Sequence, residues 1–222
     1  MTRSCLEEDD HAMELGERFA RALARAAEIH SEQKRKGTEI PYVAHVLAVC
    51  ALVLQDGGDE TEAIAALLHD AAEDQGGEAM LETIRSEFGA DVARIVAECS
   101  DTFEQPKPPW RARKESYLAH LPEASASALR VSVADKLDNA RAILSDYRRL
   151  GDDLWTRFNP DADQPWYYRS LVTRYCAIDG FESTLLDELD RTVAEIDALV
   201  DANRDQGAEL PSPATADAHR AE

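Results

Sequence analysis

The sequence predicts an all-α fold in a single domain. Ala and Leu are abundant, aromatic residues make up only 6% of the chain, and alternating apolar and polar runs bounded by turns are nearly absent. A chain of 222 residues has the usual size of one domain and buries a core without disulfides. We expect this domain to cover residues 12–204, between a flexible N-terminus at 1–11 and a disordered C-terminal tail at 205–222, which is rich in Ala, Pro, Asp and Glu.

The first half of the chain is predicted to form helices separated by glycines. Apolar residues recur at helical spacing in each segment. Pro41 suits the first position of a helix, and Asp59 or Thr61 can cap the helix that follows Gly57-Gly58. The expected helices cover about 12–36, which Gly37 ends, then 41–56, 61–75, 79–88 and 91–102.

The second half is predicted to be helical around two connections. The prolines of EQPKPPW predict an extended surface loop between helices. A helix through RKESYLAHL and a longer one at about 123–150 follow. The stretch GDDLWTRFNPDADQPWYY is expected to be irregular, and helices at about 167–178 and from Phe181 onward complete the domain.

Charge and cysteine content exclude several classes of function. The formal net charge of -20 argues against general nucleic-acid binding, which depends on Lys and Arg. No apolar run reaches the roughly 18 to 20 residues that span a bilayer, and the acidic start is unlike a signal peptide. The four cysteines show no close C-x-x-C pair, which favours a reducing compartment. We therefore expect a soluble, cytoplasmic protein without nucleic-acid or membrane partners, and the sequence does not predict its oligomeric state.

The segment LLHDAAED concentrates the candidate chemistry. His69 and Asp70 end an apolar run, where an imidazole and a carboxylate are unfavourable unless they are paired or bind a metal. On a helix, Glu73 and Asp74 lie one turn further along the same face. Such a set of nitrogen and oxygen donors suits Mn²⁺, Fe²⁺ or Zn²⁺, although a lone His-Asp dipeptide is more often structural.

Two residues elsewhere in the chain can complete this candidate site. His45 is expected about one turn into the second helix, and Asp135 is expected in the middle of the long helix among apolar neighbours. A polyanionic substrate would also need local positive charge, and Lys34-Arg35-Lys36 is the densest basic cluster.

Three ordered segments carry a resemblance to a known family. RKGTEIPYVAH, ALLHDAAED and VADKLDNAR resemble the signature segments of the hydrolase half of RelA/SpoT proteins and of the small stand-alone alarmone hydrolases. The resemblance covers residues 25–141. It implies an HD-domain helical bundle and metal-dependent phosphohydrolase activity, and nothing in the chain resembles the synthetase half.

The resemblance also implies roles for individual residues. Glu73 and Asp74 match an acidic pair that orients or deprotonates the attacking water. Arg35 and Lys36 match an Arg-Lys pair whose arginine stacks on the nucleotide base, and Asn139 matches an asparagine near the ribose. The implied ligands of one divalent cation, Mn²⁺ in our prediction, are His45, His69, Asp70 and Asp135.

The implied reaction is hydrolysis of the 3′-diphosphate of guanosine tetra- or pentaphosphate, or of the adenosine analogues, with release of pyrophosphate. Two alternatives stay open. One is an HD phosphohydrolase that acts on a nucleoside monophosphate, a deoxynucleotide or NADPH, and the other is a non-catalytic nucleotide-binding protein. The departures from the family's usual residues are Gly37, Val46, Gln75 and Ala142, and they leave the base of the nucleotide open.

Several other polar residues have two interpretations each. His30 is expected to be a hydrogen-bonded core histidine that supports the site. Lys136 and Arg141 would either neutralise carboxylates or contact phosphate. Two interpretations are open for Arg111, Arg113, Lys114 and Tyr117. They either form a patch that faces phosphate or belong to an ordinary solvent-exposed helical turn.

Overall fold

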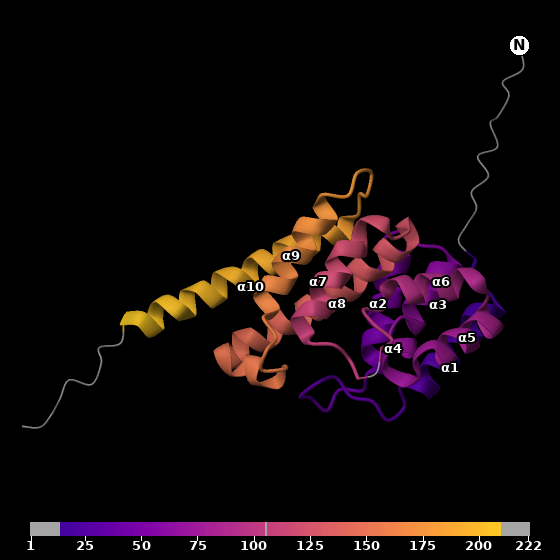
Figure 1. Ribbon diagram of the computed structural model, residues 1–222, viewed down its shortest axis with the longest axis horizontal. Coiled ribbons are helices and arrows are strands. Elements are labelled where there is room, and N and C mark those ends of the chain that lie inside the picture. Colours follow the sequence, from indigo (N-terminus) through magenta and orange to yellow (C-terminus); the bar gives the residue numbers. More distant parts are fainter. Residues whose placement is uncertain (1–13, 105, 210–222) are drawn as a thin grey trace, which may run out of the picture.

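The computed structural model describes residues 14–104 and 106–209, which form a bundle of helices (Figure 1). In this part of the chain all regular elements are helices, apart from one bridge between Lys34 and Pro41. The predicted all-α, single-domain fold is therefore confirmed. No helix among the described residues is long and apolar enough to cross a membrane. The predicted N-terminal segment 1–11 and most of the predicted tail lie outside the described residues.

The helices follow one another with short connections. The N-terminal group comprises α1 (Glu17–Ile29), α2 (Val43–Gln55), α3 (Glu60–Leu68), α4 (Ala71–Gln75), α5 (Gly77–Phe88) and α6 (Ala90–Cys99). The C-terminal group comprises α7 (Trp110–His120), α8 (Ala126–Leu150), α9 (Gln164–Cys176) and α10 (Thr184–Glu209), with short 3-10 helices η1 (Leu121–Glu123) and η2 (Gly151–Arg157).

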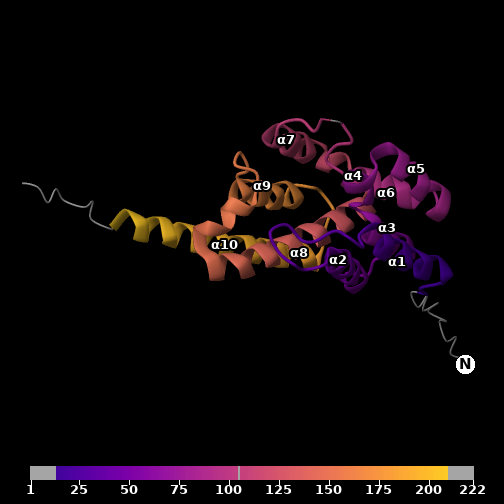
Figure 2. The same cartoon turned by 90° about the horizontal axis from the view of Figure 1, so that it is seen from below.

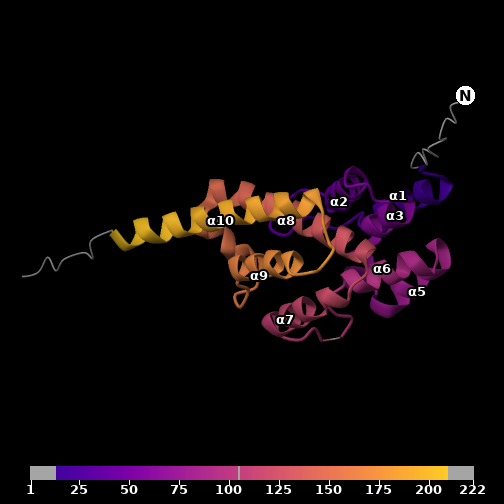
Figure 3. The same cartoon turned by 90° about the horizontal axis from the view of Figure 1, so that it is seen from above.

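Helix α8 is the central element of the bundle. It contacts α2, α3 and α6 on the N-terminal side and packs along α10 on the other. Figures 2 and 3 show α8 running between these two groups, with α10 beside it. Its buried residues extend from Ala128 to Tyr147, so one helix passes through the whole core.

The predicted first helix is wrong at its C-terminal end, because α1 stops at Ile29. Residues 30–42 form a loop in which the Arg35 N–H donates to the Ile40 carbonyl (2.8 Å) and the Tyr42 N–H donates to the Gln33 carbonyl (2.8 Å). Gly37 has a φ of 71°, a left-handed conformation that glycine adopts without strain. These cross-loop bonds replace helical ones, and the basic cluster consequently lies on a loop.

The third predicted helix is interrupted at the His-Asp dipeptide. Helix α3 ends at Leu68 and α4 begins at Ala71. Asp70 between them has φ -93° and ψ -7°, in the sparsely populated region where turn residues and many active-site residues lie. His69 and Asp70 therefore stand at a joint between two helices.

Two boundaries near the C-terminus also differ from expectation. Residues 151–157, predicted to be irregular, form η2. Helix α10 continues to Glu209, so residues 205–209 of the predicted tail are helical. Ala202 and Arg204, which follow the buried Val200, are good helix formers and help to continue α10 beyond it.

The start of α3 is fixed by a capping box. The Asp59 carboxylate accepts from the Glu62 N–H (2.9 Å), and the Glu62 carboxylate accepts from the Asp59 N–H (3.0 Å). Of the two predicted caps, Asp59 is thus the one observed. Arg130 of α8 donates to both Glu62 oxygens (2.7 and 2.8 Å), which ties the beginning of α3 to the central helix.

Replacing the capping residue should destabilise the fold. We expect Asp59→Ala to lower the free energy of unfolding by about 1 kcal/mol, because it leaves the Glu62 N–H without its acceptor. Urea denaturation followed by circular dichroism measures this change. Asp91→Ala is a suitable control, because Asp91 in the first turn of α6 is exposed and lies 3.8 Å from Arg94; it should change stability by less than about 0.5 kcal/mol. Equal losses in the two variants would argue against the capping box.

Candidate metal centre and adjoining cleft

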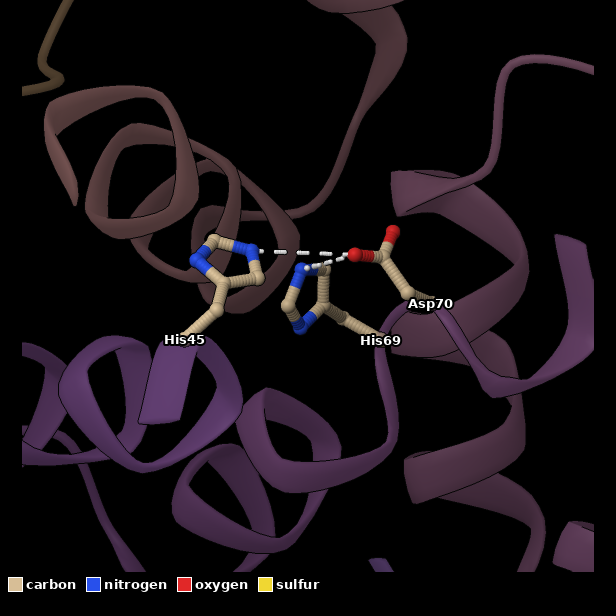
Figure 4. Close-up of side chains that lie close together, drawn as sticks. All are labelled: His45, His69 and Asp70. Atoms are coloured by element: carbon tan, nitrogen blue, oxygen red, sulfur yellow. Dashed lines mark ion pairs between the residues drawn. The ribbon is translucent and has the colours of Figure 1, made fainter. Parts of the chain in front are cut away.

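Three elements bring the predicted metal ligands to one point. His45 comes from the first turn of α2, and His69 and Asp70 come from the joint between α3 and α4 (Figure 4). Each offers one ligand atom, and these atoms lie within 4.8 Å of one another. The Asp70 Oδ2 atom is 3.0 Å from His69 Nε2 and 3.7 Å from His45 Nε2.

The fourth predicted ligand approaches from the middle of α8. The Asp135 Oδ1 atom lies 3.2 Å from His45 Nε2 and 3.6 Å from His69 Nε2. Asp135 is buried, as are both histidines. Asp135 therefore lies beside both histidines of the group that His45, His69 and Asp70 form.

The outer nitrogens of both histidines are already engaged. His45 Nδ1 lies 2.6 Å from the Asp138 carboxylate, and His69 Nδ1 lies 2.8 Å from the Ala66 carbonyl. Both Nε2 atoms are buried and lie 3.0 to 3.2 Å from a candidate ligand carboxylate, but within the described residues neither makes a well-aligned hydrogen bond. Buried polar atoms are rarely left so, and this pattern, in which one ring nitrogen is held by an oxygen and the other faces the ligands, is typical of metal-binding histidines. The group therefore fits a divalent cation.

The electrostatics of the centre also favour a cation. Burial alone lowers the pKa of His45, but the carboxylates of Asp135, Asp138 and Asp70 outweigh it and raise that pKa to about 9. The centre thus stabilises positive charge strongly. A bound divalent cation would neutralise the same carboxylates without protonation of the imidazoles.

Glu73 and Asp74 lie one turn beyond Asp70 but have different neighbours. The Asp74 carboxylate accepts from Gln33 Nε2 (2.8 Å) in the 30–42 loop. The Glu73 carboxylate accepts from Lys107 Nζ (3.0 Å) in the segment between α6 and α7. Burial raises the pKa of both, with a further contribution from Asp101 for Glu73 and from Asp70 for Asp74. The pKa values of Glu73 and Asp74 are therefore set by different neighbours.

A cleft of about 460 Å³ opens beside the centre, a size typical of small-molecule sites. Three of its lining residues contact the candidate ligands directly. The Tyr42 hydroxyl donates to Asp70 Oδ2 (2.5 Å), Lys136 Nζ to Asp135 Oδ2 (2.5 Å) and Asn139 Nδ2 to Asp135 Oδ1 (2.5 Å). The cleft and the candidate metal centre thus share a wall.

The cleft is cationic although the chain is strongly acidic. Asp146 is the one carboxylate among its lining residues in the described part of the chain. The predicted substrate residues Arg35, Lys36 and Asn139 all line it. Its cationic side chains are Arg35, Lys36, Lys114, Lys136, Arg149 and Arg157.

The structure shows different contacts for the other polar residues that the sequence analysis named. Lys114 lines the cleft, whereas Arg111 stacks on Trp166. Arg141 pairs with Glu188 of α10. The remaining residues of this group have structural contacts: Arg113 pairs with Asp101, Tyr117 hydrogen-bonds Ser132, and the buried His30 lies 2.7 Å from Gln33 Oε1.

Sequence reasoning missed three residues next to the centre. Asp138 could have been found, because it follows Asp135 by three positions and so shares its helix face. Tyr42 and Lys107 carry no such signal, since the tertiary fold alone brings them to Asp70 and Glu73.

Comparison with known proteins identifies relatives of this arrangement. Residues 22–159 match the HD domain family. The guanosine-3′,5′-bis(diphosphate) 3′-pyrophosphohydrolase MESH1 of Xenopus tropicalis is 39% identical over 134 residues, which cover 59% of this chain and 70% of that protein. The Homo sapiens protein of the same name is 35% identical over 134 residues, with the same coverage of 59% and 70%.

A solved structure shares the fold as well. A metazoan orthologue of SpoT, which hydrolyses ppGpp and plays a role in starvation responses, matches with a TM-score of 0.65 and 27% identity over 83% of this chain and 98% of that one. The family predicted from the three sequence segments is therefore confirmed. The chain belongs to the HD-domain family and is a metal-dependent HD phosphohydrolase related to the MESH1-type and SpoT-type proteins.

Proposed function

We propose that this protein hydrolyses the 3′-diphosphate of guanosine 3′,5′-bis(diphosphate) and releases pyrophosphate and GDP. The MESH1 proteins that share its HD region are named for this reaction. The observation that carries the proposal is a cationic cleft of nucleotide size whose lining residues contact the candidate ligands Asp70 and Asp135. A polyanionic nucleotide can place a phosphate at the centre while the rest of the molecule lies on the cations of the cleft.

The proposed metal ligands are His45, His69, Asp70 and Asp135. We propose Mn²⁺ as the cation, because two imidazoles and two carboxylates are a donor set that Mn²⁺ accepts. When bound, the cation would lower the pKa of a coordinated water and offset charge on phosphoryl oxygens. Lys136 and Asn139 hold the two oxygens of Asp135 and thereby fix the orientation of this carboxylate.

Glu73 and Asp74 are the proposed catalytic residues. Burial raises the pKa of both carboxyl groups, which brings their basicity closer to neutral pH and suits proton transfer. They would orient the attacking water and accept its proton. The hydrogen bond from Lys107 keeps the Glu73 carboxylate in a defined position, and the one from Gln33 does the same for Asp74.

Arg35, Lys36 and Asn139 are the proposed substrate-binding residues. The Arg35 guanidinium pairs with Asp138 (3.3 Å), so its plane is held beside the centre, where it can stack on a base. Lys36 lies over the Phe158 ring, 5.7 Å from its centroid. A location in the cytoplasm, where nucleotides are abundant, stays part of the proposal.

The substrate proposal is tested by measuring products. Mn²⁺-loaded protein is incubated separately with guanosine 3′,5′-bis(diphosphate), its adenosine analogue, a nucleoside monophosphate and NADPH, and pyrophosphate and phosphate are quantified separately. We expect pyrophosphate from the guanosine bis(diphosphate). Release of phosphate from NADPH or the monophosphate, with both bis(diphosphates) untouched, would refute the substrate while leaving the HD chemistry.

Removing a proposed proton acceptor should separate turnover from metal binding. We expect Glu73→Gln to bind Mn²⁺ as the wild type does but to lose about 10² to 10⁴-fold in kcat, because the amide cannot accept a proton. Glu104→Gln is the matched control, since Glu104 is exposed, and it should retain full activity. A Glu73→Gln variant with normal kcat would exclude a catalytic role for Glu73.

The carboxylate behind His45 should tune metal affinity. We expect Asp138→Asn to weaken Mn²⁺ binding by about 10 to 100-fold, because the Asp138 carboxylate orients His45 and raises its basicity. Calorimetric titration of the metal-free protein with Mn²⁺ measures this change directly. Asp190→Asn, on the exposed side of α10, is the control and should bind Mn²⁺ normally. Unchanged affinity in Asp138→Asn would show that His45 needs no such support.

A further inference from the structure

The outer wall of the cleft is the aromatic segment that follows α8. Trp155 of η2 packs against Tyr147 of α8 (5.2 Å between ring centroids) and against Phe158 (6.1 Å). Leu154 is buried in the same region. This packing fixes residues 151–158 on the end of α8, so Arg157 projects from a supported position into the lining of the cleft.

Arg157 is seated on Gly37 of the 30–42 loop. A Cβ atom added at Gly37 would lie 2.6 Å from Arg157 Cδ and 3.0 Å from its Cγ. Gly37 also has a φ of 71°, so any larger residue there is both strained and in collision with the arginine. The glycine therefore lets the Arg157 side chain run against the loop backbone, next to Lys36.

Asp146 holds the other end of this side chain. The Asp146 Oδ2 atom accepts from Arg157 Nη1 (2.8 Å), and its Oδ1 atom accepts from Arg149. The Asp146 side chain is 18% exposed and that of Arg157 is 26% exposed. A guanidinium has five N–H donors, so one bond to Asp146 orients the group and leaves donors for a further anion.

One face of helix α8 extends from the metal centre to the aspartate that holds Arg157. Asp135, Asn139, Ala142, Asp146 and Arg149 are spaced by four and three residues, so they share one face of the helix. The last four line the cleft, which therefore runs along α8 away from Asp135. Asp146 lies eleven positions after Asp135, which corresponds to about 16 Å along the helix axis.

Four of the cations of the cleft lie toward its two ends. Lys136 lies at the inner end on Asp135. At the outer end Arg149 and Arg157 both pair with Asp146, and Lys36, next to Gly37, lies over the Phe158 ring. This outer group keeps a positive charge, because two arginines share one carboxylate. A substrate with a single phosphate group at the metal centre would leave this outer group without an anion.

We propose that Arg157, seated on Gly37 and held by Asp146, forms with Lys36 a second anion site that binds the 5′-phosphates of the nucleotide. This site makes the enzyme selective for substrates that are phosphorylated on both sides of the ribose. The inference rests on the proposed function for the choice of nucleotide, but the site itself is defined by its own residues. Arginine suits it because its planar fork binds phosphate with two parallel hydrogen bonds.

The test compares two substrates that differ only at the 5′ position. Pyrophosphate release is measured from guanosine 3′,5′-bis(diphosphate) and from guanosine 3′-diphosphate with a free 5′-hydroxyl. In Arg157→Ala we expect kcat/KM for the first to fall at least about 10-fold through KM, since a charge-assisted contact is lost. The second substrate should stay within about 2-fold of wild type. Arg157→Lys should retain part of the preference, and Arg174→Ala, an exposed arginine of α9, should retain all of it.

A binding measurement separates this inference from the proposed function. GDP and guanosine are titrated calorimetrically into the wild type and the Arg157 variants, which needs no turnover. We expect the wild type to bind GDP more tightly than guanosine and Arg157→Ala to lose most of this preference. Gly37→Ala should reduce the GDP preference with an unchanged circular dichroism spectrum, because it displaces Arg157.

Two results would overturn the second anion site. One is equal binding of GDP and guanosine by the wild type. The other is an equal loss of both ligands in Arg157→Ala, which would assign the arginine to base stacking or to structure. Absence of pyrophosphate release by the wild type, with the GDP preference intact, would instead refute the proposed reaction and support the site.

Discussion

The placement of two aspartates beside two buried histidines is the constraint on which the rest of the structure depends. The buried Asp135 of α8 and the half-buried Asp70 of the α3–α4 joint both lie against these histidines. Buried carboxylates are strongly unfavourable unless opposite charge compensates them. The raised pKa of His45 shows that positive charge is stabilised at this place, and a divalent cation would supply that charge. The centre is thus unfavourable for folding without compensating charge, and it is also the functional part of the fold.

The surrounding fold holds these groups against their mutual repulsion. The capping box at Asp59 and the pair between Glu62 and Arg130 fix α3 to α8 at the far end from His69. Lys136 lies directly on Asp135 and offsets its charge within the core. Because α8 carries Asp135 and also the floor of the cleft, any shift of this helix would move the metal centre and the substrate site together. Chemistry and recognition are therefore positioned by one rigid element.

The sequence predicted the centre better than its surroundings, and the reason is physical. His69 and Asp70 interrupt an apolar run, and a buried polar pair is visible in sequence because it is unfavourable there. Residues 30–36 were predicted to be helical but belong to the 30–42 loop, because the cross-loop bonds that replace helical ones form only once the chain has folded. The contact between His45 and Asp138 spans 93 residues, and the contact of Arg157 with Gly37 joins η2 to the 30–42 loop, which no local pattern connects. Local periodicity predicts helices and unfavourable side chains, whereas long-range contacts depend on the topology.

The net charge of -20 and the cations of the cleft act on a phosphorylated ligand at different distances. Salt screens exposed charges beyond about 8 Å at physiological ionic strength, so the acidic exterior only weakly opposes the approach of a small polyanion. Inside the cleft the cations are close to the ligand and screened less, and they decide what binds. A long nucleic acid would instead have to extend over the acidic surface outside the cleft, where few counterions could be released. The charge distribution thus favours a small, highly phosphorylated nucleotide, and it disfavours polymers that carry the same phosphates.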